Sequence, residues 1–172
     1  NLMEQDGDKD RLNAAKEEAE NAYKIKFPPM RFGQDNRKIV AISKENKITS
    51  SLTSIKGFGK DIGNNMFDLA QIQHNNFVDL LVYTINSNVF SSKFENLIKI
   101  NYFEQFGNNK KLLAFFKEFT KGKYRYNKKL KDKTKQLRLV ELHNIFNNIE
   151  NKRLNFNSQL DAEKEILGYL QS

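Results

Sequence analysis

The sequence predicts a mainly α-helical protein that contains one short β-hairpin. Apolar residues recur at helical spacing through most of the chain, as Leu137, Val140 and Ile145 do in one long segment. Residues 9–23 are rich in helix formers. Only residues 39–49 carry two short β-branched runs around a polar centre, a pattern typical of a β-hairpin.

The predicted elements follow a simple order along the chain. The helix over residues 9–23 places Leu12 and Ala15 on one face, and Pro28 and Pro29 then force an extended passage. The hairpin comes next, with its apolar runs at residues 39–42 and 48–49. Further helices are predicted at residues 50–55, 60–74, 77–86, 91–99, 108–120, 133–149 and 159–170.

Composition excludes several classes of site. The 172 residues include no cysteine, so disulfides and thiolate metal sites are absent. The two histidines, His74 and His143, are predicted to be surface or helix-end residues rather than ligands. No apolar run approaches the roughly 20 residues that span a bilayer. Acids lead the chain, unlike a signal peptide. We therefore expect a cytoplasmic protein with no membrane partner.

Charge is distributed unevenly along the chain, which has a net charge of +8. Residues 1–22 hold seven acids and three bases, whereas residues 110–138 hold twelve bases and two acids. Such a basic cluster attracts phosphate polymers, although it is also compatible with a solvated helical face. Residues 124–133 within it are poorly periodic and are predicted to form a mobile linker.

Residues 51–63 carry the most informative local pattern. A short helical segment is followed by a hydrophobic-x-Gly-hydrophobic-Gly turn and then by a second helix. Gly57 and Gly59 can adopt positive φ, which allows a tight reversal, and Phe58 would hold the turn against the core. Gly63 would let the two helices approach closely. The alternative is a helix stopped by glycine and followed by an unrelated helix.

This pattern resembles the helix-hairpin-helix motif, which binds the DNA backbone without reading base sequence. Amides at the start of the second helix would face a phosphate oxygen, with a lysine on either side. Backbone amides and lysines carry no base information, so binding is expected to be independent of sequence and sensitive to salt. The predicted contact residues are Lys56, Gly57, Phe58, Gly59 and Lys60.

The order of motifs along the chain resembles a segment of the bacterial C-family replicative DNA polymerases, the alpha subunit of DNA polymerase III. An acidic helix leads to a Pro-Pro passage at residues 25–29, and a β-hairpin precedes the Leu-x-x-Ile-Lys-Gly-hydrophobic-Gly pattern at residues 52–59. A Phe-x-x-Leu segment matches residues 77–80. The Glu-x-Glu-x-Leu-Gly-x-Tyr-Leu-Ser strand, which introduces the family's oligonucleotide-binding domain, resembles residues 163–172.

The family's second hairpin resembles residues 97–107, a Leu-Ile-x-x-x-x-Phe-x-x-hydrophobic-Gly pattern. Asn101 stands where the family prefers glycine, which puts this hairpin in doubt. Met30 and Arg31 replace an acidic continuation after the prolines, and Gly63 stands where alanine is commoner. The resemblance implies further contacts to the double-stranded DNA backbone at Gly107, Asn108, Asn109, Lys110 and Lys111.

The resemblance implies a fragment of a larger replicase. Residues 1–36 would end the fingers region, and residues 37–120 would form the β-hairpin and a tandem helix-hairpin-helix domain. Residues 121–172 would supply a basic linker, a helix and the lead-in to an oligonucleotide-binding domain. The fragment would lie in the cytoplasm of a bacterium or of a phage-infected cell and meet other replisome subunits there.

The catalytic chemistry of the family is not expected in this fragment. The parent enzyme would be a DNA-directed DNA polymerase, a nucleotidyltransferase using two magnesium ions held by palm-domain carboxylates. Nothing here resembles that motif, so the fragment is expected to have no cofactor and no activity alone. Asp6, Asp8 and Asp10 alternate near the start of the chain, but we do not expect them to bind metal.

A short peptide in the predicted helix over residues 133–149 suggests a second partner. Gln136, Leu137, Leu139 and Val140 resemble the Gln-Leu-x-Leu-Phe peptide with which these polymerases bind the sliding clamp, with valine in place of the aromatic residue. The alternative is that the apolar members are core residues of the helix.

Aromatic residues elsewhere are predicted to pack rather than to bind. Tyr124 and Tyr126 have basic neighbours and could instead stack on unpaired bases. Phenylalanines at helical spacing are expected in the core, namely Phe67, Phe77, Phe90, Phe94, Phe103, Phe115, Phe116 and Phe119.

Two rival functions remain open at this level. The first is a free-standing helix-hairpin-helix factor of DNA repair or recombination, which would need neither the Pro-Pro passage nor the C-terminal pattern. The second is an adaptor whose basic helices bind acidic proteins, which would show no preference for duplex DNA.

Overall fold

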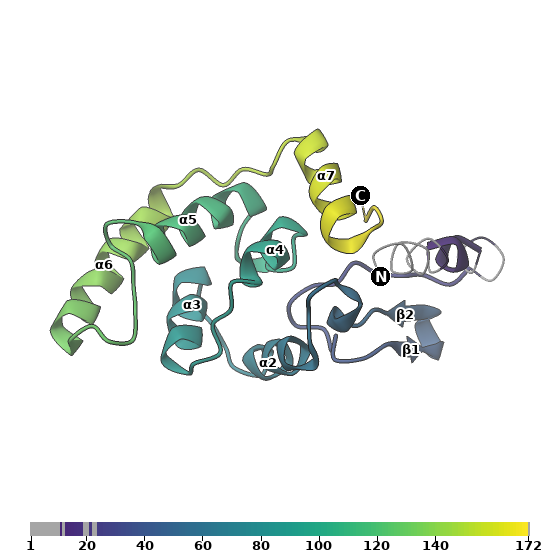
Figure 1. The fold of residues 1–172 in the computed structure, drawn as a ribbon, viewed down its shortest axis with the longest axis horizontal. Coiled ribbons are helices and arrows are strands. Elements are labelled where there is room, and N and C mark those ends of the chain that lie inside the picture. Colours follow the sequence, from purple (N-terminus) through teal and green to yellow (C-terminus); the bar gives the residue numbers. More distant parts are fainter. Residues whose placement is uncertain (1–10, 12, 19–20, 22–23, 172) are drawn as a thin grey trace. The chain divides into compact units, whose positions relative to one another are not determined.

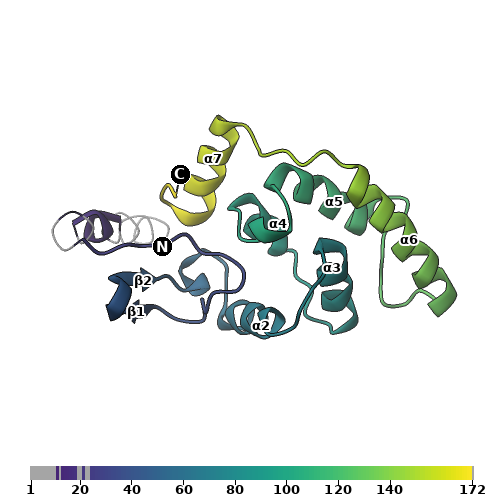
Figure 2. The ribbon, with the colours of Figure 1, turned by 180° about the vertical axis from the view of Figure 1, so that it is seen from behind.

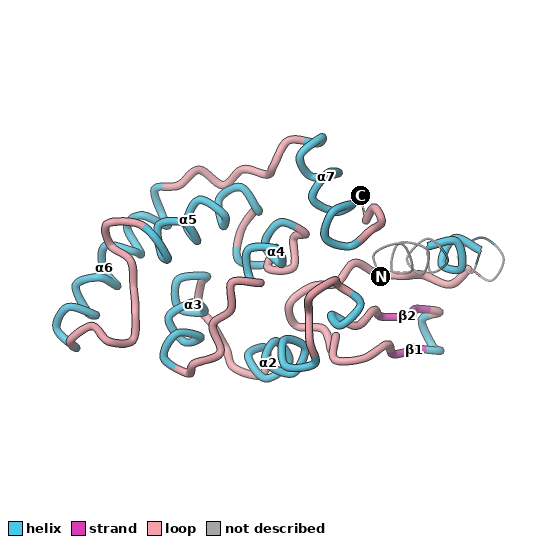
Figure 3. Tube along the Cα trace, viewed as in Figure 1, coloured by secondary structure: helices cyan, strands magenta, loops and turns pink. Residues whose placement is uncertain are grey.

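The computed structural model describes residues 11, 13–18, 21 and 24–171. Over these residues the chain is mainly helical with one short β-hairpin, which confirms the predicted fold class (Figure 1, Figure 3). The chain divides into two compact units. The first unit combines Asn1–Gln71 with Phe156–Ser172, and the second comprises Ile72–Asn155. These boundaries differ from the three segments expected from the motifs, and they place the two predicted DNA-binding hairpins in different units.

The first unit contains the β-hairpin. Strands β1 (Val40–Ile42) and β2 (Lys47–Thr49) pair antiparallel, with Ala41 opposite Ile48, and the 3₁₀ helix η1 (Ser43–Glu45) joins them. Lys26 adds a parallel bridge to Lys47. This unit also contains the 3₁₀ helix η2 (Leu52–Ser54), helix α2 (Lys60–Ala70) and helix α7 (Phe156–Leu167), and residues 13–18 are helical within the predicted N-terminal helix.

Two predicted helices of this unit are shorter than expected. The helix expected at residues 50–55 is the single turn η2, because Ser51 and Ile55 at its ends both have extended backbone. The Ser51 side chain caps that turn by accepting from the Thr53 amide. Helix α2 ends at Ala70 rather than at residue 74. Asn76 must be extended to cap the next helix, so the chain leaves the helical conformation before it.

The second unit contains helices α3 (Phe77–Asn86), α4 (Phe94–Lys99), α5 (Asn109–Lys121) and α6 (Asp132–Asn148), with the 3₁₀ helix η3 (Glu104–Phe106) before α5. Figures 1 and 2 show α5 and α6 side by side. Phenylalanine rings form the core: Phe77 lies 5.5 Å from Phe103 and 6.3 Å from Phe115 between ring centroids. Of the predicted core phenylalanines, all but Phe67 and Phe90 are buried.

The predicted mobile linker is anchored in the structure. The loop between α5 and α6 has no regular secondary structure, as its poor periodicity predicts, but Tyr126 is buried within it. The Tyr126 hydroxyl lies 3.2 Å from Asn86 Oδ1, its amide donates to the Phe119 carbonyl, and its ring stacks on that of Phe119. Tyr126 is therefore a core residue and cannot stack on a base.

Candidate nucleic-acid interface

The first predicted hairpin forms the turn between η2 and α2. Ile55 and Phe58 are buried, so the two apolar residues of the turn hold it against the core of the first unit. The residues between and after them, Lys56, Gly57 and Gly59, are exposed. This alternation of buried and exposed positions presents the glycine side of the turn to solvent.

The two glycines of the turn serve different purposes. Gly57 has φ +82°, a conformation that side chains rarely adopt, and the Phe58 amide closes the turn by donating to the Ile55 carbonyl at 3.0 Å. Gly59 has φ −89° and ψ 177°, which any residue can adopt. Of the two glycines that can adopt positive φ, only Gly57 does so in this turn.

Gly59 instead leaves the start of a helix open. It is the N-cap of α2, and a Cβ added there would meet nothing within 4 Å. The first amides of a helix have no helical acceptor, and Gly59 offers no side chain to satisfy them. Together with the positive end of the helix dipole, these amides suit a phosphate oxygen.

The absence of a side chain at Gly63 allows close approach of the loop at Asn36 and Arg37, not of the preceding helix. A Cβ on Gly63 would lie 3.3 Å from Arg37 Cα and 3.5 Å from the Asn36 carbonyl oxygen, so the expected helix-to-helix approach is corrected. Asn36 is buried, its Nδ2 donates to the Ser50 carbonyl, and its own carbonyl accepts from the Leu52 amide. The loop at Asn36 and Arg37 therefore packs against Gly63 of α2 and is hydrogen-bonded to Leu52 of η2.

Arg37 ties the supporting loop to α2. Its guanidinium donates to both oxygens of Asp35, at 2.9 and 2.8 Å, and lies 3.6 Å from the centre of the Phe67 ring. The hydrogen bonds from Arg37 lower the pKa of the Asp35 carboxyl to about 2. Sequence reasoning missed this loop. An Asp-x-Arg spacing was its only local signal, and that spacing is common in turns.

The charges beside the open helix end have both signs. Lys56 and Lys60 are exposed, which suits contacts to a phosphate chain. Asp61 is also exposed and lies in the first turn of α2. Its carboxylate stabilises the helix dipole but competes with a bound phosphate for the same amides.

The second predicted hairpin has the backbone that its sequence pattern implies. Asn101, at the position where the resembled family prefers glycine, has φ +65°, the left-handed conformation that asparagine tolerates best after glycine. Gly107 has φ +150°, and an added Cβ would lie 3.2 Å from Leu112 Cδ2. Asn101 therefore has a backbone conformation that a turn can use.

The start of α5, however, is already occupied by the chain itself. The Asn108 amide donates to Asn151 Oδ1 at 2.8 Å, and the Lys111 amide donates to the Lys152 carbonyl at 3.4 Å. Asn109 is buried; its Nδ2 donates to the Lys99 carbonyl and its Oδ1 accepts from the Leu154 amide. Asn108 and Asn109 thus hold residues 151–154 across the helix end.

The lysines of the second hairpin differ from each other. Lys110 is exposed on the first turn of α5. Lys111 is half-buried, with its ammonium 4.2 Å from the centre of the Phe146 ring. Lys110 is thus accessible, whereas the side chain or amide of each of the other four predicted contacts is bonded within the chain. The first hairpin is therefore the better candidate for a phosphate contact.

The clamp-like peptide lies in the middle of α6. Leu137 and Val140 are 63% and 60% exposed, so they are not core residues, while Leu139 is half-buried. Gln136 is exposed on the same helix. Clamp binding remains a prediction, and an extended docking mode would require this part of α6 to unwind.

Neither histidine lies in a ligand cluster among the described residues. His143 Nε2 lies 3.2 Å from Asp79 Oδ1, and its Nδ1 is 3.0 Å from the Leu139 carbonyl oxygen, which links α6 to α3. His74 meets the edge of the Tyr83 ring.

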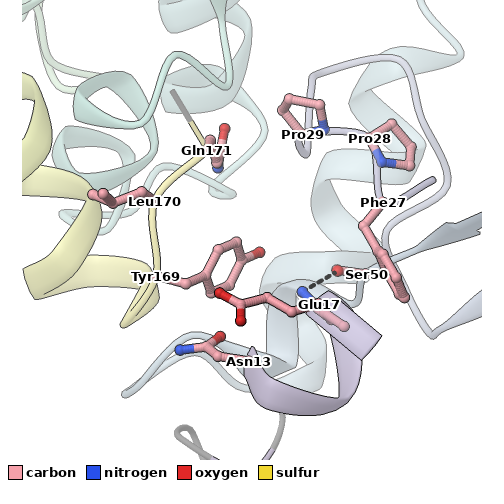
Figure 4. Close-up of a pocket in the computed structure, with 10 residues that line it drawn as sticks. Asn13, Glu17, Phe27, Pro28, Pro29, Ser50, Tyr169, Leu170 and Gln171 are labelled. Atoms are coloured by element: carbon pink, nitrogen blue, oxygen red, sulfur yellow. Dashed lines mark hydrogen bonds between the residues drawn. The ribbon is translucent and has the colours of Figure 1, made fainter. Parts of the chain in front are cut away.

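A pocket in the first unit was not predicted. Figure 4 shows Tyr169 pointing into it, with Phe27 and Pro28 opposite. Lys16 Nζ lies 4.1 Å from the centre of the Tyr169 ring and donates to Ser50 Oγ at 3.3 Å. Burial raises the pKa of the Tyr169 hydroxyl. The Lys16 ammonium and the Tyr169 ring therefore contact each other, and this contact joins the C-terminal segment to the remainder of the first unit.

No helix within the described residues is long and apolar enough to cross a membrane, and no group of three or more metal-ligating side chains occurs among them. The alternating Asp6, Asp8 and Asp10 lie outside the described residues. No protein-family model matches this chain, and no curated protein matches it.

Proposed function

We propose that this chain binds double-stranded DNA by its sugar-phosphate backbone, without reading base sequence. The observation that carries the proposal is the open start of α2 at Gly59, held outward by a turn whose apolar residues are buried. Unsatisfied amides, the helix dipole and exposed lysines act on the same phosphate oxygen. None of these groups distinguishes one base pair from another.

The order of motifs supports a wider proposal. The chain is part of a replicative polymerase similar to the DNA polymerase III alpha subunit and acts in the cytoplasm beside other replisome subunits. Its work there is to hold duplex while nucleotidyl transfer takes place in a palm domain with two magnesium ions. The left-handed Asn101 supports this proposal, because it supplies the turn at the place where the family uses glycine.

Gly59→Asp tests the DNA proposal directly. Aspartate is a favoured N-cap, and its side chain can accept from the amides that a phosphate would use. We expect the thermal stability to stay equal or to rise by roughly a few tenths of a kcal/mol. Duplex affinity should fall about tenfold or more, because charge-assisted hydrogen bonds are lost. Fluorescence anisotropy with a labelled duplex, together with thermal unfolding, measures both quantities.

Asn144→Asp is the matched control, since it makes the same change in charge at an exposed position of α6. It should leave duplex affinity within about twofold, because an exposed charge outside the site acts only through screened long-range attraction. Equal affinity of wild type and Gly59→Asp at low salt would refute the hairpin as the DNA site. Equal affinity of the wild type for duplex DNA and for a polyanion such as heparin would instead favour the basic adaptor.

A further inference from the structure

Helix α6 has two apolar faces, and only one of them is packed. On the inner face Leu142 and Phe146 are buried, and the Phe146 ring meets the Phe115 ring of α5 edge-on at 5.2 Å. On the outer face Leu137 and Val140 lie three residues apart and are 63% and 60% exposed. A surface helix that packs only against its own domain normally carries polar residues there.

The exposed pair belongs to a shaped surface. Leu137 and Val140 line a pocket with Tyr124, Thr134, Arg138 and Glu141, which we call the α6 groove. The Arg138 guanidinium donates to the Arg125 carbonyl at 2.7 Å, so the loop that carries Tyr124 is tied to α6. The groove thus joins two separate segments of the second unit and does not depend on one flexible side chain.

The surroundings of the groove are strongly basic. Residues 121–141 contain nine lysines and arginines and two acids. The ion pairs formed among the described residues lie outside residues 121–141. Seven of these nine basic residues are exposed. A partner that covers the groove therefore meets a dense positive field and must itself be acidic.

The aliphatic side chains indicate the class of that partner. Leucine and valine cannot stack on bases, and Lys123 already lies 5.4 Å from the centre of the Tyr124 ring. We propose that the α6 groove binds an acidic segment of another protein that inserts apolar side chains against Leu137 and Val140. Burial of the two side chains supplies affinity, and the charges supply orientation and association rate.

The folded helix itself is the binding surface in this proposal. Leu139 is half-buried, whereas Leu137 and Val140 are largely exposed, so the groove uses the latter two side chains. The clamp-like peptide would use Gln136 and Leu139 together with Leu137 and Val140, in an extended conformation. Gln136 and Leu139 therefore distinguish the two modes, because only the clamp-like peptide requires them.

Binding of two synthetic peptides to the full chain tests the proposal. One labelled twelve-residue peptide contains glutamates with leucines at helical spacing, and the other replaces every leucine by serine at the same charge. The leucine peptide should bind at least about tenfold more tightly, since its apolar side chains are removed from water on binding. The double variant Leu137→Ser, Val140→Ser should lose about tenfold affinity for the leucine peptide. Phe156→Ser, at another exposed apolar residue, should lose none.

Three results would overturn the proposal. The first is equal binding of the two peptides, which would mean attraction by charge alone. The second is an unchanged affinity of the double variant, provided that circular dichroism shows α6 intact. The third is a loss of affinity for a single-stranded oligonucleotide in the double variant without loss of peptide binding, which would assign the groove to nucleic acid. Gln136→Ala should leave peptide affinity unchanged, and a tenfold loss would favour the extended mode instead.

Discussion

At the scale of single residues, three glycines near the first hairpin have three different physical reasons. Gly57 is required by its backbone, which has φ +82°. Gly63 is required by space, because a Cβ would press on the Arg37 backbone at 3.3 Å. Gly59 is required by neither. A residue that the fold does not need at an exposed helix start is the position where a ligand is the most direct explanation, and this is why Gly59→Asp is the sharpest test.

The supporting loop gives a prediction that concerns pH. The pKa of Asp35 is lowered to about 2 by its hydrogen bonds from Arg37. A lowered folded-state pKa adds stability above the unfolded value near 3.8, and this stability is lost as the pH falls toward 2. NMR titration of the Asp35 carboxyl carbon should give a midpoint near 2 in the wild type. In Arg37→Gln the midpoint should rise toward the ordinary value, and equal midpoints in both proteins would contradict the ion pair.

At the scale of elements, the starts of α2 and α5 were both predicted as DNA-binding hairpins, but they have different surroundings. The start of α2 is open at Gly59, whereas the start of α5 is covered by residues 151–154, which take the amides of Asn108 and Lys111. Orphan amides at a helix start must find an acceptor in the chain, in water or in a ligand. Among the described residues, other segments supply such acceptors at the start of α5, and none does so at the start of α2.

Asn109→Ala tests this difference. Asn109 is buried and bonded to the Lys99 carbonyl and the Leu154 amide, so its removal leaves buried polar groups without partners. Chemical denaturation should show a loss of about 1–3 kcal/mol in the free energy of unfolding. Duplex affinity of the folded variant should stay within about twofold, since the side chain faces the interior. A large loss of affinity at unchanged stability would restore Asn109 as a DNA contact.

At the scale of the whole molecule, the main concentration of positive charge and the proposed phosphate contact lie in different units. The net charge of +8 attracts any polyanion, but most of the basic excess lies in the second unit, around the α6 groove. The proposed phosphate contact lies in the first unit, between Lys56 and Lys60 in the sequence. Long-range attraction and local contact can therefore be measured separately, because only the contact releases counterions at a defined place.

The salt dependence of duplex binding measures the contact. The double variant Lys56→Gln, Lys60→Gln should reduce the slope of log affinity against log salt by about 1 to 2, at roughly 0.9 for each neutralised phosphate. Lys44→Gln with Lys164→Gln removes the same charge from exposed positions of the same unit and should change the slope by less than about half a unit. The same decrease in slope for both pairs would mean that overall charge, and not the hairpin, governs binding.

The sequence by itself determined what depends on near neighbours. Helical spacing predicted α3 at Phe77–Asn86, and the hydrophobic-x-Gly-hydrophobic-Gly pattern predicted a turn with Phe58 against the core and with positive φ available to Gly57. Each of these features follows from residues a few positions apart, because helix periodicity and turn conformation are local properties of the backbone.

The tertiary structure decided which surfaces remain open. Asn151 reaches Asn108 across 43 positions and closes the start of α5, while Asn36 and Arg37 support the first hairpin from a loop more than ten residues upstream. Packing also turned Leu137 and Val140 outward. Whether a helix end or face stays exposed depends on which distant segment packs against it, and no local sequence pattern encodes that packing. The open start of α2 and the α6 groove are therefore found only in the folded chain.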